Sequence, residues 1–252
     1  MPNRTHRVGV QTEMNPTGYT NCLVSVPTRP AVEPKPAASV ILLRETGAGP
    51  EILYLRRSPD LKFMGGYWVF PGGRVDPEDQ QASAPADELT TARHAATREA
   101  HEEAGVNLDP NTLHPICQWT TPASSPIRFA TWFFAAATNP VAIRVDGVEI
   151  HEHQWWRPEA AIRAHREGAI QFANPTFALS TRLAGHSSVA EVLATIDTWP
   201  RERFLGRLHP IDGGQVALYA EDCGYDSGQI DCDSPHHRIW MVDGGWRYER
   251  AF

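Results

Sequence analysis

Cysteine is scarce in this 252-residue chain, and long apolar runs are absent. The cysteines are far apart in the sequence, a spacing that argues against a disulfide framework and favours reduced thiols. They are Cys22, Cys117, Cys223 and Cys232. No apolar segment approaches the ~20 residues that span a bilayer, and the sequence after Met1 lacks the apolar core of a secretory signal. We therefore expect a soluble, cytoplasmic protein with no membrane partner.

An excess of positive charge is also absent. The chain has 23 Lys and Arg against 30 Asp and Glu, for a formal net charge of −7, and no dense basic stripe is interleaved with aromatic residues. Such a surface does not attract nucleic acid, so we exclude a nucleic-acid partner and retain small phosphorylated molecules. Trp240, Trp246 and Tyr248 are expected to be packing residues, or else the surface of a homodimer or of a substrate arm.

The length allows one domain with additions. Residues 1–35 have no sustained periodicity and are expected to form a loosely ordered N-terminal arm. Residues 36–198 are expected to form the main domain with a helical extension. After Pro200 the Gly-Gly pairs and short alternating runs predict a small β appendage over residues 199–252.

Within the main domain, apolar runs and capping residues predict alternating strands and helices. Residues 76–86 are polar and are expected to form an exposed loop. Strands are expected at 37–43, 51–56, 67–70, within 115–138 and at 149–156, and helices at 87–104, 160–167, 175–183 and 188–197. The helix at 87–104 has Asp87 and Glu88 at its start and Gly105 after its end.

Three glutamates on that helix are candidates for metal binding. Glu99, Glu102 and Glu103 stand at positions i, i+3 and i+4 and therefore share one helix face. Like charges repel at this spacing, and a hard divalent cation such as Mg²⁺, which prefers oxygen ligands, would offset the repulsion. The alternative is a solvated acidic face with no ligand.

The segment from Arg98 to Val106, Arg-Glu-Ala-His-Glu-Glu-Ala-Gly-Val, resembles the second half of the Nudix box. Upstream, Phe70-Pro71-Gly72-Gly73 resembles the strand end and opening glycine of the same box. In the complete box, five residues separate the glycine from a first glutamate, and seven more precede the arginine. Counting back from Arg98 instead places Thr90 and Ala84 at these positions. We infer an insertion of about eleven residues between Gly73 and the helix, with the first glutamate absent or replaced by Glu88 or Asp87.

The resemblance implies a Nudix fold of the α+β class, in which a mixed β-sheet is sandwiched between helices, here with a C-terminal helical and β appendage. It also implies Mg²⁺ or Mn²⁺ as cofactor, held by Glu99, Glu102, Glu103 and the Gly73 carbonyl, with Arg98 orienting the helix. The implied reaction is attack of water on a phosphorus of a diphosphate. The general base is left open among Glu103, Glu149 and Glu152, and His151 and His153 are expected to be ordinary strand residues.

The segment that contains Leu53, Arg57, Ser58, Leu61 and Lys62 is similar to a pattern in coenzyme A-cleaving Nudix hydrolases. Phe63-Met64, Trp119-x-Thr121-Pro122, residues 128–134 and residues 174–184 look like the acyl-coenzyme A diphosphatase branch. Three positions depart from these patterns: Met64 stands where the family has His, Lys62 where it has Arg, and Ala130 where an acid is usual. The resemblance spans roughly residues 37–197 and implies cleavage of coenzyme A or acyl-coenzyme A to 3′,5′-ADP and phosphopantetheine or its acyl form. The expected substrate-binding residues are Arg57, Lys62, Arg128, Phe70 and Gly72, with Arg56 as a further cation.

Three other hypotheses stay open. The nearest rival activity is hydrolysis of ADP-ribose or a nucleotide sugar, and the non-enzyme alternative is a Nudix-fold ligand sensor that has lost catalysis. The zinc hypothesis concerns Cys223, Cys232, His236 and His237, whose spacing lacks a CxxC pair and gives only a weak signal.

Overall fold

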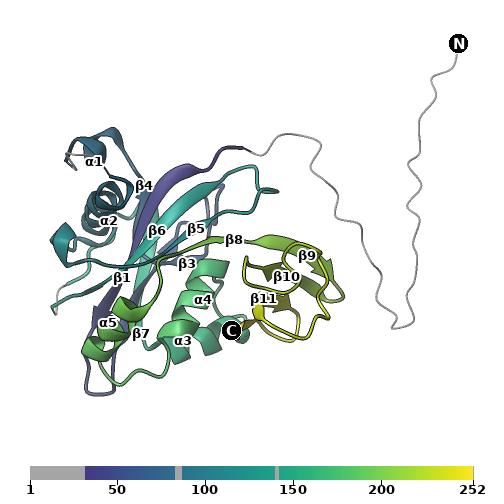
Figure 1. Ribbon diagram of the computed structural model, residues 1–252. Coiled ribbons are helices and arrows are strands. Elements are labelled where there is room, and N and C mark those ends of the chain that lie inside the picture. The colour runs from purple at the N-terminus through teal and green to yellow at the C-terminus, as the bar shows by residue number, and fades with distance from the viewer. Residues whose placement is uncertain (1–31, 83–86, 140–141, 252) are drawn as a thin grey trace, which may run out of the picture. The chain divides into compact units, whose positions relative to one another are not determined.

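Two β-sheets organise the chain in the computed structural model, which describes residues 32–82, 87–139 and 142–251 (Figure 1). The larger sheet has eight strands. They are β1 (Lys35–Arg44), β2 (Glu51–Arg57), β3 (Trp68–Val69), β4 (Gly72–Arg74), β5 (His114–Thr120), β6 (Phe129–Ala137), β7 (Ile150–Trp156) and β8 (Glu202–Leu205). Of the expected N-terminal arm, residues 1–31 lie outside the described residues.

The larger sheet is mixed, as expected. Its main order is β3-β2-β1-β6-β5-β8, while β4 pairs with β1 and β7 pairs with β2. The β1–β6 and β5–β8 pairs are parallel, and the other pairs are antiparallel. The central strand β1 is buried continuously from Ala37 to Leu43, as expected for a strand whose two faces are both covered.

Helices cover the two faces of this sheet (Figure 1). On one face, α2 (Glu88–Ala104) packs a row of buried alanines against Val40 and Leu42. The other face holds Ile41 and Leu43 and packs against α3 (Pro158–Arg166), α4 (Asn174–Leu183) and α5 (Val189–Thr198). Alternate residues of one strand therefore serve two separate cores, because successive side chains point to opposite faces.

The ends of α2 are set by local capping. The Asp87 carboxylate accepts hydrogen bonds from the backbone N–H groups of Leu89 and Thr90, both at 3.0 Å. At the other end Gly105 has φ 70°, and its N–H donates to the final turn. The helix predicted over 87–104 is confirmed with these boundaries.

The polar tract at 76–86, expected to be an exposed loop, contains the short helix α1 (Pro77–Ala82). Residues 83–86 lie outside the described part of the chain. Within α1, Asp79 is only 4% exposed, and its carboxylate accepts a hydrogen bond from the Asp76 N–H at 2.8 Å. A polar composition did not reveal that one of its acids is buried against α2.

A second, antiparallel sheet of four strands follows the main sheet. Its strands are β9 (Arg207–Ile211), β10 (Gly214–Leu218), β11 (His236–Val242) and β12 (Arg247–Ala251), in the order β12-β11-β10-β9. We call these strands with their connecting loops, residues 206–251, the C-terminal sheet. The preceding strand β8 lies in the expected appendage by sequence, yet it pairs with β5 of the larger sheet. A single-turn 3₁₀ helix, η1 (Pro110–Thr112), completes the elements given by the described residues.

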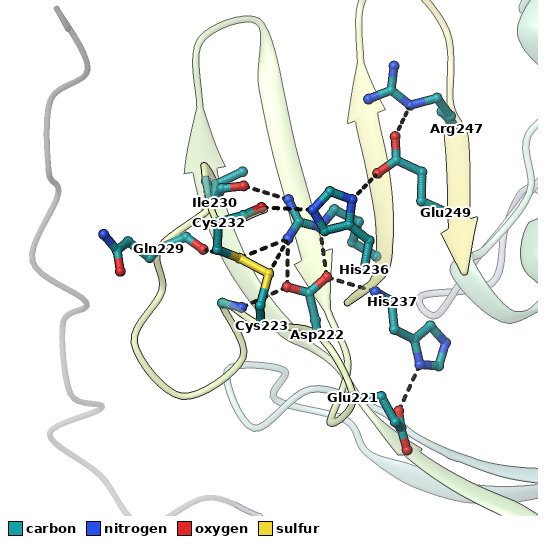
Figure 2. Close-up of polar contacts among 12 residues, drawn as sticks. Glu221, Asp222, Cys223, Gln229, Ile230, Cys232, His236, His237, Arg247 and Glu249 are labelled. Carbon is teal, nitrogen blue, oxygen red and sulfur yellow. Dashed lines mark hydrogen bonds and ion pairs between the residues drawn. A yellow bond between two sulfur atoms is a disulfide. The ribbon is translucent and has the colours of Figure 1, made fainter. Parts of the chain in front are cut away.

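The C-terminal sheet contains a disulfide. Cys223 is bonded to Cys232 in the connection between β10 and β11 (Figure 2), whereas Cys117 is free and buried. The expectation of reduced thiols is therefore wrong for this pair. The pairing depends on how the long connection folds back on itself, which a sequence separation of nine residues does not reveal.

Beside the disulfide lies a buried ion pair. Arg238 donates from Nε and Nη2 to the two carboxylate oxygens of Asp222, each at 2.7 Å, and both side chains are at most 1% exposed. Burial alone would raise the pKa of Asp222, but the Arg238 guanidinium and two backbone N–H donors outweigh it, so the pKa lies below its usual value. The pair fixes the β10–β11 connection against β11.

The structure brings three of the four residues of the zinc hypothesis together and places the side chain of the fourth, His237, elsewhere. Potential donor atoms of Cys223, Cys232 and His236 lie within 4.8 Å of one another. His237 is turned to other partners: its Nδ1 lies 2.8 Å from Glu221 (Figure 2). Its Nε2 lies 3.0 Å from the Tyr248 hydroxyl. Because both cysteine sulfurs are held in a disulfide, they cannot act as thiolate ligands, and we assign no zinc site here.

None of the helices in the described residues is both long enough and apolar enough to traverse a bilayer.

Candidate active site

One cavity of about 850 Å³ joins the two sheets and contains the glutamate cluster. Its walls come from α2, β4, the loop before β3, the β5–β6 connection, the start of α4 and the C-terminal sheet. Glu99, Glu102 and Glu103 all line it, together with Gly72 and Gly73. The structure therefore brings together the three glutamates of the box and the glycine pair that precedes it.

Glu103 is the most deeply placed of these acids, with 4% exposure. Its Oε2 accepts a hydrogen bond from the Gly72 N–H at 2.9 Å. Burial raises its pKa from the ordinary 4.5 to about 8, and the charge of Glu99 adds to the shift, while the Gly72 N–H opposes it. A buried carboxylate of this kind is stabilised in its charged form when a cation lies beside it.

Arg98 gathers the other two glutamates. Its Nη1 donates to Glu99 Oε1 at 2.9 Å and to Glu102 Oε2 at 3.0 Å. Burial raises the pKa of Glu99 above its usual value, although the Arg98 guanidinium opposes the shift. The Glu99 carboxylate lies against the Cα of Gly73, where any Cβ would collide with it. A glycine at position 73 is thus required for this approach.

The partner that holds Arg98 is Asp79 of helix α1. Arg98 donates from Nε and Nη2 to the two oxygens of Asp79, at 3.2 and 3.0 Å, and from Nη2 to the Arg74 carbonyl at 2.8 Å. This fork fixes the guanidinium on both sides, because a planar Arg matches a carboxylate in two-point contact. Arg98 thereby couples α1, β4 and α2 around the glutamates.

A fourth glutamate reaches the cavity from the segment before β7. Glu149 lines the cavity with a side chain that is 57% exposed, and the nearest cation is Arg57, 3.8 Å away. The Asp146 carboxylate accepts hydrogen bonds from the N–H groups of Val148, Glu149 and Ile150 at 2.9 to 3.1 Å. Asp146 therefore sets the backbone from which Glu149 projects.

Comparison with known families identifies the arrangement. A model described as the NUDIX domain matches residues 33–176, more than half of the chain. The chain belongs to the Nudix family.

Curated relatives and solved structures agree with this membership. A nudix hydrolase of Schizosaccharomyces pombe is 37% identical over 32% of the chain, and nudix hydrolase 7 of Caenorhabditis elegans is 30% identical over 59% of it. The chain spans 25% and 60% of the lengths of these two relatives. An asymmetrical bis(5′-nucleosyl)-tetraphosphatase of C. elegans is 27% identical over 48% of the chain and 75% of its own length. All three are named as hydrolases of nucleotides or of the Nudix type.

The fold is confirmed by a solved relative. The crystal structure of a NUDIX hydrolase from Alicyclobacillus acidocaldarius superposes with a TM-score of 0.61 at 21% identity, and covers 67% of this chain and 99% of that one. The mixed sheet between helices expected from the Nudix box is therefore the observed α+β architecture.

Asp79 occupies the position of the first acid of the Nudix box, which the sequence interpretation missed. Five residues separate Gly73 from Asp79, which is the spacing of the box. The insertion of about eleven residues expected between Gly73 and the helix therefore lies after Asp79. The two proposed substitutes are placed elsewhere. Asp87 caps α2, and Glu88 accepts hydrogen bonds from Trp132 and Arg203. Counting forward from Gly73 and allowing Asp for Glu would have found the residue.

The predicted substrate-binding residues divide into two groups. Arg57, Phe70 and Gly72 line the cavity that contains the glutamate cluster. Lys62 is exposed and lies outside the described lining, whereas Arg128 is buried and donates to the carbonyls of Thr121 and Val32 at 3.0 and 2.6 Å. The structure thus gives Arg128 a structural role in place of the expected contact with substrate. Its hydrogen-bonded partners are backbone groups, which sequence patterns do not reveal.

Two further residues are also away from the cavity. Arg56 and Glu152 pair with each other at 3.0 Å, and neither belongs to the described lining. Among the three candidates for the general base, Glu103 and Glu149 belong to the described lining of this cavity and Glu152 does not. The choice therefore narrows to an acid on α2 or an acid before β7.

The donor set of the cavity fits a hard divalent cation. The candidate ligands are the carboxylate oxygens of the three glutamates and the Gly73 carbonyl oxygen. Mg²⁺ and Mn²⁺ accept oxygen ligands of both kinds, and Mg²⁺ usually takes only one or two carboxylates along with waters and phosphates. The carboxylate oxygens of the three glutamates do not all lie within 4.8 Å of one another. In the described part of the chain, only the group of Cys223, Cys232 and His236 has its possible ligand atoms this close. Glu103 is only 4% exposed, and a cation beside it would stabilise its carboxylate in the charged form.

The pKa of Glu103 predicts a pH-dependent stability in the metal-free protein. Because the folded-state pKa, about 8, lies above the ordinary 4.5, stability from the protonated carboxyl is fully present below pH 4.5 and is lost as the pH rises through 8. Thermal melts in EDTA should therefore show a lower Tm at pH 9 than at pH 6. Glu103→Gln should flatten this part of the profile, and an equally steep decline in that variant would contradict the assignment.

Asp79 gives a second prediction. Asp79→Asn keeps the shape of the side chain but weakens the hold on Arg98, and substitution of such outer partners typically costs 10–100-fold in metal affinity or activity. We expect activity to fall by about tenfold, with a parallel increase in the Mg²⁺ concentration needed for half-maximal rate. Asp76→Asn is the matched control, because the Asp76 carboxylate is 51% exposed and 3.9 Å from Arg98. Equal effects of the two variants would remove the special role of Asp79.

Proposed function

We propose that the protein is a Mg²⁺- or Mn²⁺-dependent diphosphatase that hydrolyses coenzyme A or acyl-coenzyme A to 3′,5′-ADP and phosphopantetheine or its acyl form. The single supporting observation is spatial. The segments that resemble the acyl-coenzyme A branch contribute Phe63, Met64, Trp119, Thr121, Pro122, Asn174, Pro175 and Thr176 to the same cavity as the glutamates. Residues from three separate segments of the sequence thus line the same cavity as the glutamates of α2.

In the proposed reaction, one water molecule is added across the diphosphate. The water oxygen forms a bond to one phosphorus, the bond from that phosphorus to the bridging oxygen breaks, and the bridging oxygen leaves with the other phosphate. A bound divalent cation neutralises phosphate charge and lowers the pKa of water. Glu99, Glu102 and Glu103 would hold this cation. Either Glu103 or Glu149 would accept the water proton.

The protein side chains also orient the reactants. Arg98 holds Glu99 and Glu102 through one nitrogen, and Asp79 holds Arg98. Arg57 lines the cavity near Glu149 and supplies a positive charge for a phosphate oxygen. Placement of charge before the reaction begins is the main source of rate enhancement expected at such a site.

One observation favours a second candidate, hydrolysis of ADP-ribose or a nucleotide sugar. The 3′-phosphate of coenzyme A requires cations, and of the four basic residues expected to bind it only Arg57 lines the described cavity. A substrate without that phosphate has no such requirement. The asymmetrical tetraphosphatase among the relatives adds dinucleoside polyphosphates to the substrates worth assaying.

A substrate panel distinguishes these candidates. Coenzyme A, acyl-coenzyme A esters, ADP-ribose, NADH and a dinucleoside tetraphosphate are assayed with Mg²⁺ and with Mn²⁺, and products are identified by mass. Release of 3′,5′-ADP supports the coenzyme A proposal, and AMP released from ADP-ribose supports the second candidate. Ligand binding without turnover of any member of the panel would instead identify a sensor and would overturn the enzymatic proposal.

A further inference from the structure

The C-terminal sheet forms one wall of the active-site cavity. This is the part of the chain that the Nudix match does not reach, since the match ends at residue 176. Its lining residues are Gly206, Leu208, Gln215, Tyr219, Met241 and Trp246. They come from β9, β10, β11 and the segments beside these strands, so the contact involves the sheet as a whole.

This wall differs in charge from the catalytic side. Among the described lining residues, those from the C-terminal sheet include no Asp, Glu, Lys or Arg. The glutamate side presents Glu99, Glu102, Glu103 and Glu149 to the same cavity. Core residues of the lining near the sheet are also aromatic, with Trp119 in β5 and Phe172 before α4. Arg57, Arg74 and Arg98 also line the glutamate side, so the cavity is charged on one side and uncharged on the other.

Aromatic contacts hold the wall firmly against the core. The ring of Trp119 lies 5.0 Å from that of Tyr219, and Trp246 lies 5.5 Å from Phe177 of α4 and 4.7 Å from His165 of α3. Such pairs contribute beyond the area they bury. The wall is thus a packed and preformed surface, as expected for a ligand-binding pocket.

The sheet order gives the length scale that separates the two sides. The β4 strand, which carries Gly72 and Gly73, pairs with β1, and β6 and then β5 follow across the sheet. Adjacent strands are ~4.8 Å apart, so the three steps from β4 through β1 and β6 to β5, the Trp119 strand, span on the order of 14 Å. A diphosphate held beside β4 must extend an arm of about this length to reach Trp119, against which Tyr219 of the C-terminal sheet packs.

We propose that the C-terminal sheet binds the uncharged, apolar arm of the diphosphate substrate and selects against arms that carry a charge at their far end. Gln215 is the specificity-determining residue that we single out. It is exposed on β10, lines the cavity, and places its Nε2 3.9 Å from the sulfur of Met241. The inference rests on the proposed diphosphatase function but not on coenzyme A as the substrate.

The test uses two synthetic probes and two charge variants. The probes are the octyl ester of ADP and its counterpart with a carboxylate at the end of the alkyl chain, both assayed with Mg²⁺. Wild type should favour the octyl probe in kcat/KM. A charge close to the arm should change the ratio by about tenfold, so Gln215→Glu should raise the preference and Gln215→Lys should lower it.

Gln229 offers a matched control. It is exposed in the β10–β11 connection and lies outside the described lining, and its side chain points away from the disulfide region (Figure 2). Gln229→Glu and Gln229→Lys should leave the probe ratio within twofold of wild type. Thermal melts should show that all four variants are folded, since both positions are on the surface.

The outcomes separate this inference from the proposed function. No discrimination by wild type, an unchanged ratio in both Gln215 variants, or the same shifts in the Gln229 variants would overturn the assignment of the wall. If the probes are hydrolysed with the expected changes in the kcat/KM ratio but coenzyme A esters are not cleaved, the binding role of the C-terminal sheet is supported and coenzyme A is rejected as the substrate. If the probes bind without being hydrolysed, their affinities are measured by calorimetry. The ratio of the affinity for the octyl probe to that for the carboxylate probe then tests the assignment of the wall in place of the kcat/KM ratio.

Discussion

Glu103→Gln is expected to lower turnover by about 10² or more, with the fold retained. The substitution removes a charge and keeps the shape, and the glutamine oxygen can still accept the hydrogen bond that the Gly72 N–H donates to Glu103 at 2.9 Å. Because a buried carboxylate is replaced by a neutral group, the metal-free variant should be at least as stable as wild type at alkaline pH. Initial rates on the best substrate of the panel, with Mg²⁺ in excess, measure the effect.

Glu102→Gln is expected to lose a similar factor, about 10² or more. Its carboxylate is 54% exposed and is held by Arg98, so its loss should leave the core intact. Glu152→Gln is the matched control, since Glu152 pairs with Arg56 outside the described cavity lining and should keep a rate near that of wild type. Near-wild-type rates in both Glu102→Gln and Glu103→Gln would refute the assignment of the metal site.

The largest stability effect is expected at the buried ion pair of the C-terminal sheet. Arg238→Met leaves the Asp222 carboxylate buried without its partner, and loss of one member of such a pair costs about 3–5 kcal/mol. Asp222 also accepts hydrogen bonds from the N–H groups of Gly224 and His237, at 2.9 and 2.8 Å, so the effect should extend to the β10–β11 connection. Urea unfolding at neutral pH measures the change in the free energy of unfolding.

Two comparisons make this prediction specific. The double variant Arg238→Met/Asp222→Leu should be less destabilised than the single Arg238→Met, because no unpaired charge stays buried. Asp226→Ala breaks an exposed pair with Arg207, in which the Asp226 side chain is 91% exposed, and should change stability by no more than about 0.5 kcal/mol. If Arg238→Met and Asp226→Ala have equal effects on the free energy of unfolding, the buried pair does not stabilise the sheet.

The glutamate variants and the Arg238 variant both affect the active-site cavity, because the C-terminal sheet contributes part of its lining. A variant that loosens the sheet without unfolding the core should raise KM for long-armed substrates more than it lowers kcat. The glutamate variants should do the reverse, since they remove interactions with the reacting phosphate. The split between kcat and KM thus distinguishes the catalytic side of the cavity from the binding side.

Local sequence signals were sufficient for much of the fold. The α2 helix, its Asp87 cap and its Gly105 terminator follow from contacts within a few residues, and such contacts form whatever the rest of the chain does. The spacing of Glu99, Glu102 and Glu103 placed them on one face for the same reason. Strands β1, β2, β3, β5, β6 and β7 of the mixed sheet followed from their apolar, β-branched and aromatic runs. Strands β4 and β8 did not, because they carry no such run and are defined by their pairing with β1 and β5.

Contacts between distant segments could be decided only by the tertiary structure. The pairing of Arg98 with Asp79, the structural use of Arg128 and the Cys223–Cys232 disulfide each depend on which backbone or side chain is brought near. Sequence periodicity carries no information on such partners, because it reports only which face of an element is apolar. The sequence by itself determined the Nudix architecture and the acidic helix. Only the tertiary structure decided that the C-terminal sheet closes the cavity, since that wall is built from residues more than a hundred positions beyond the glutamates.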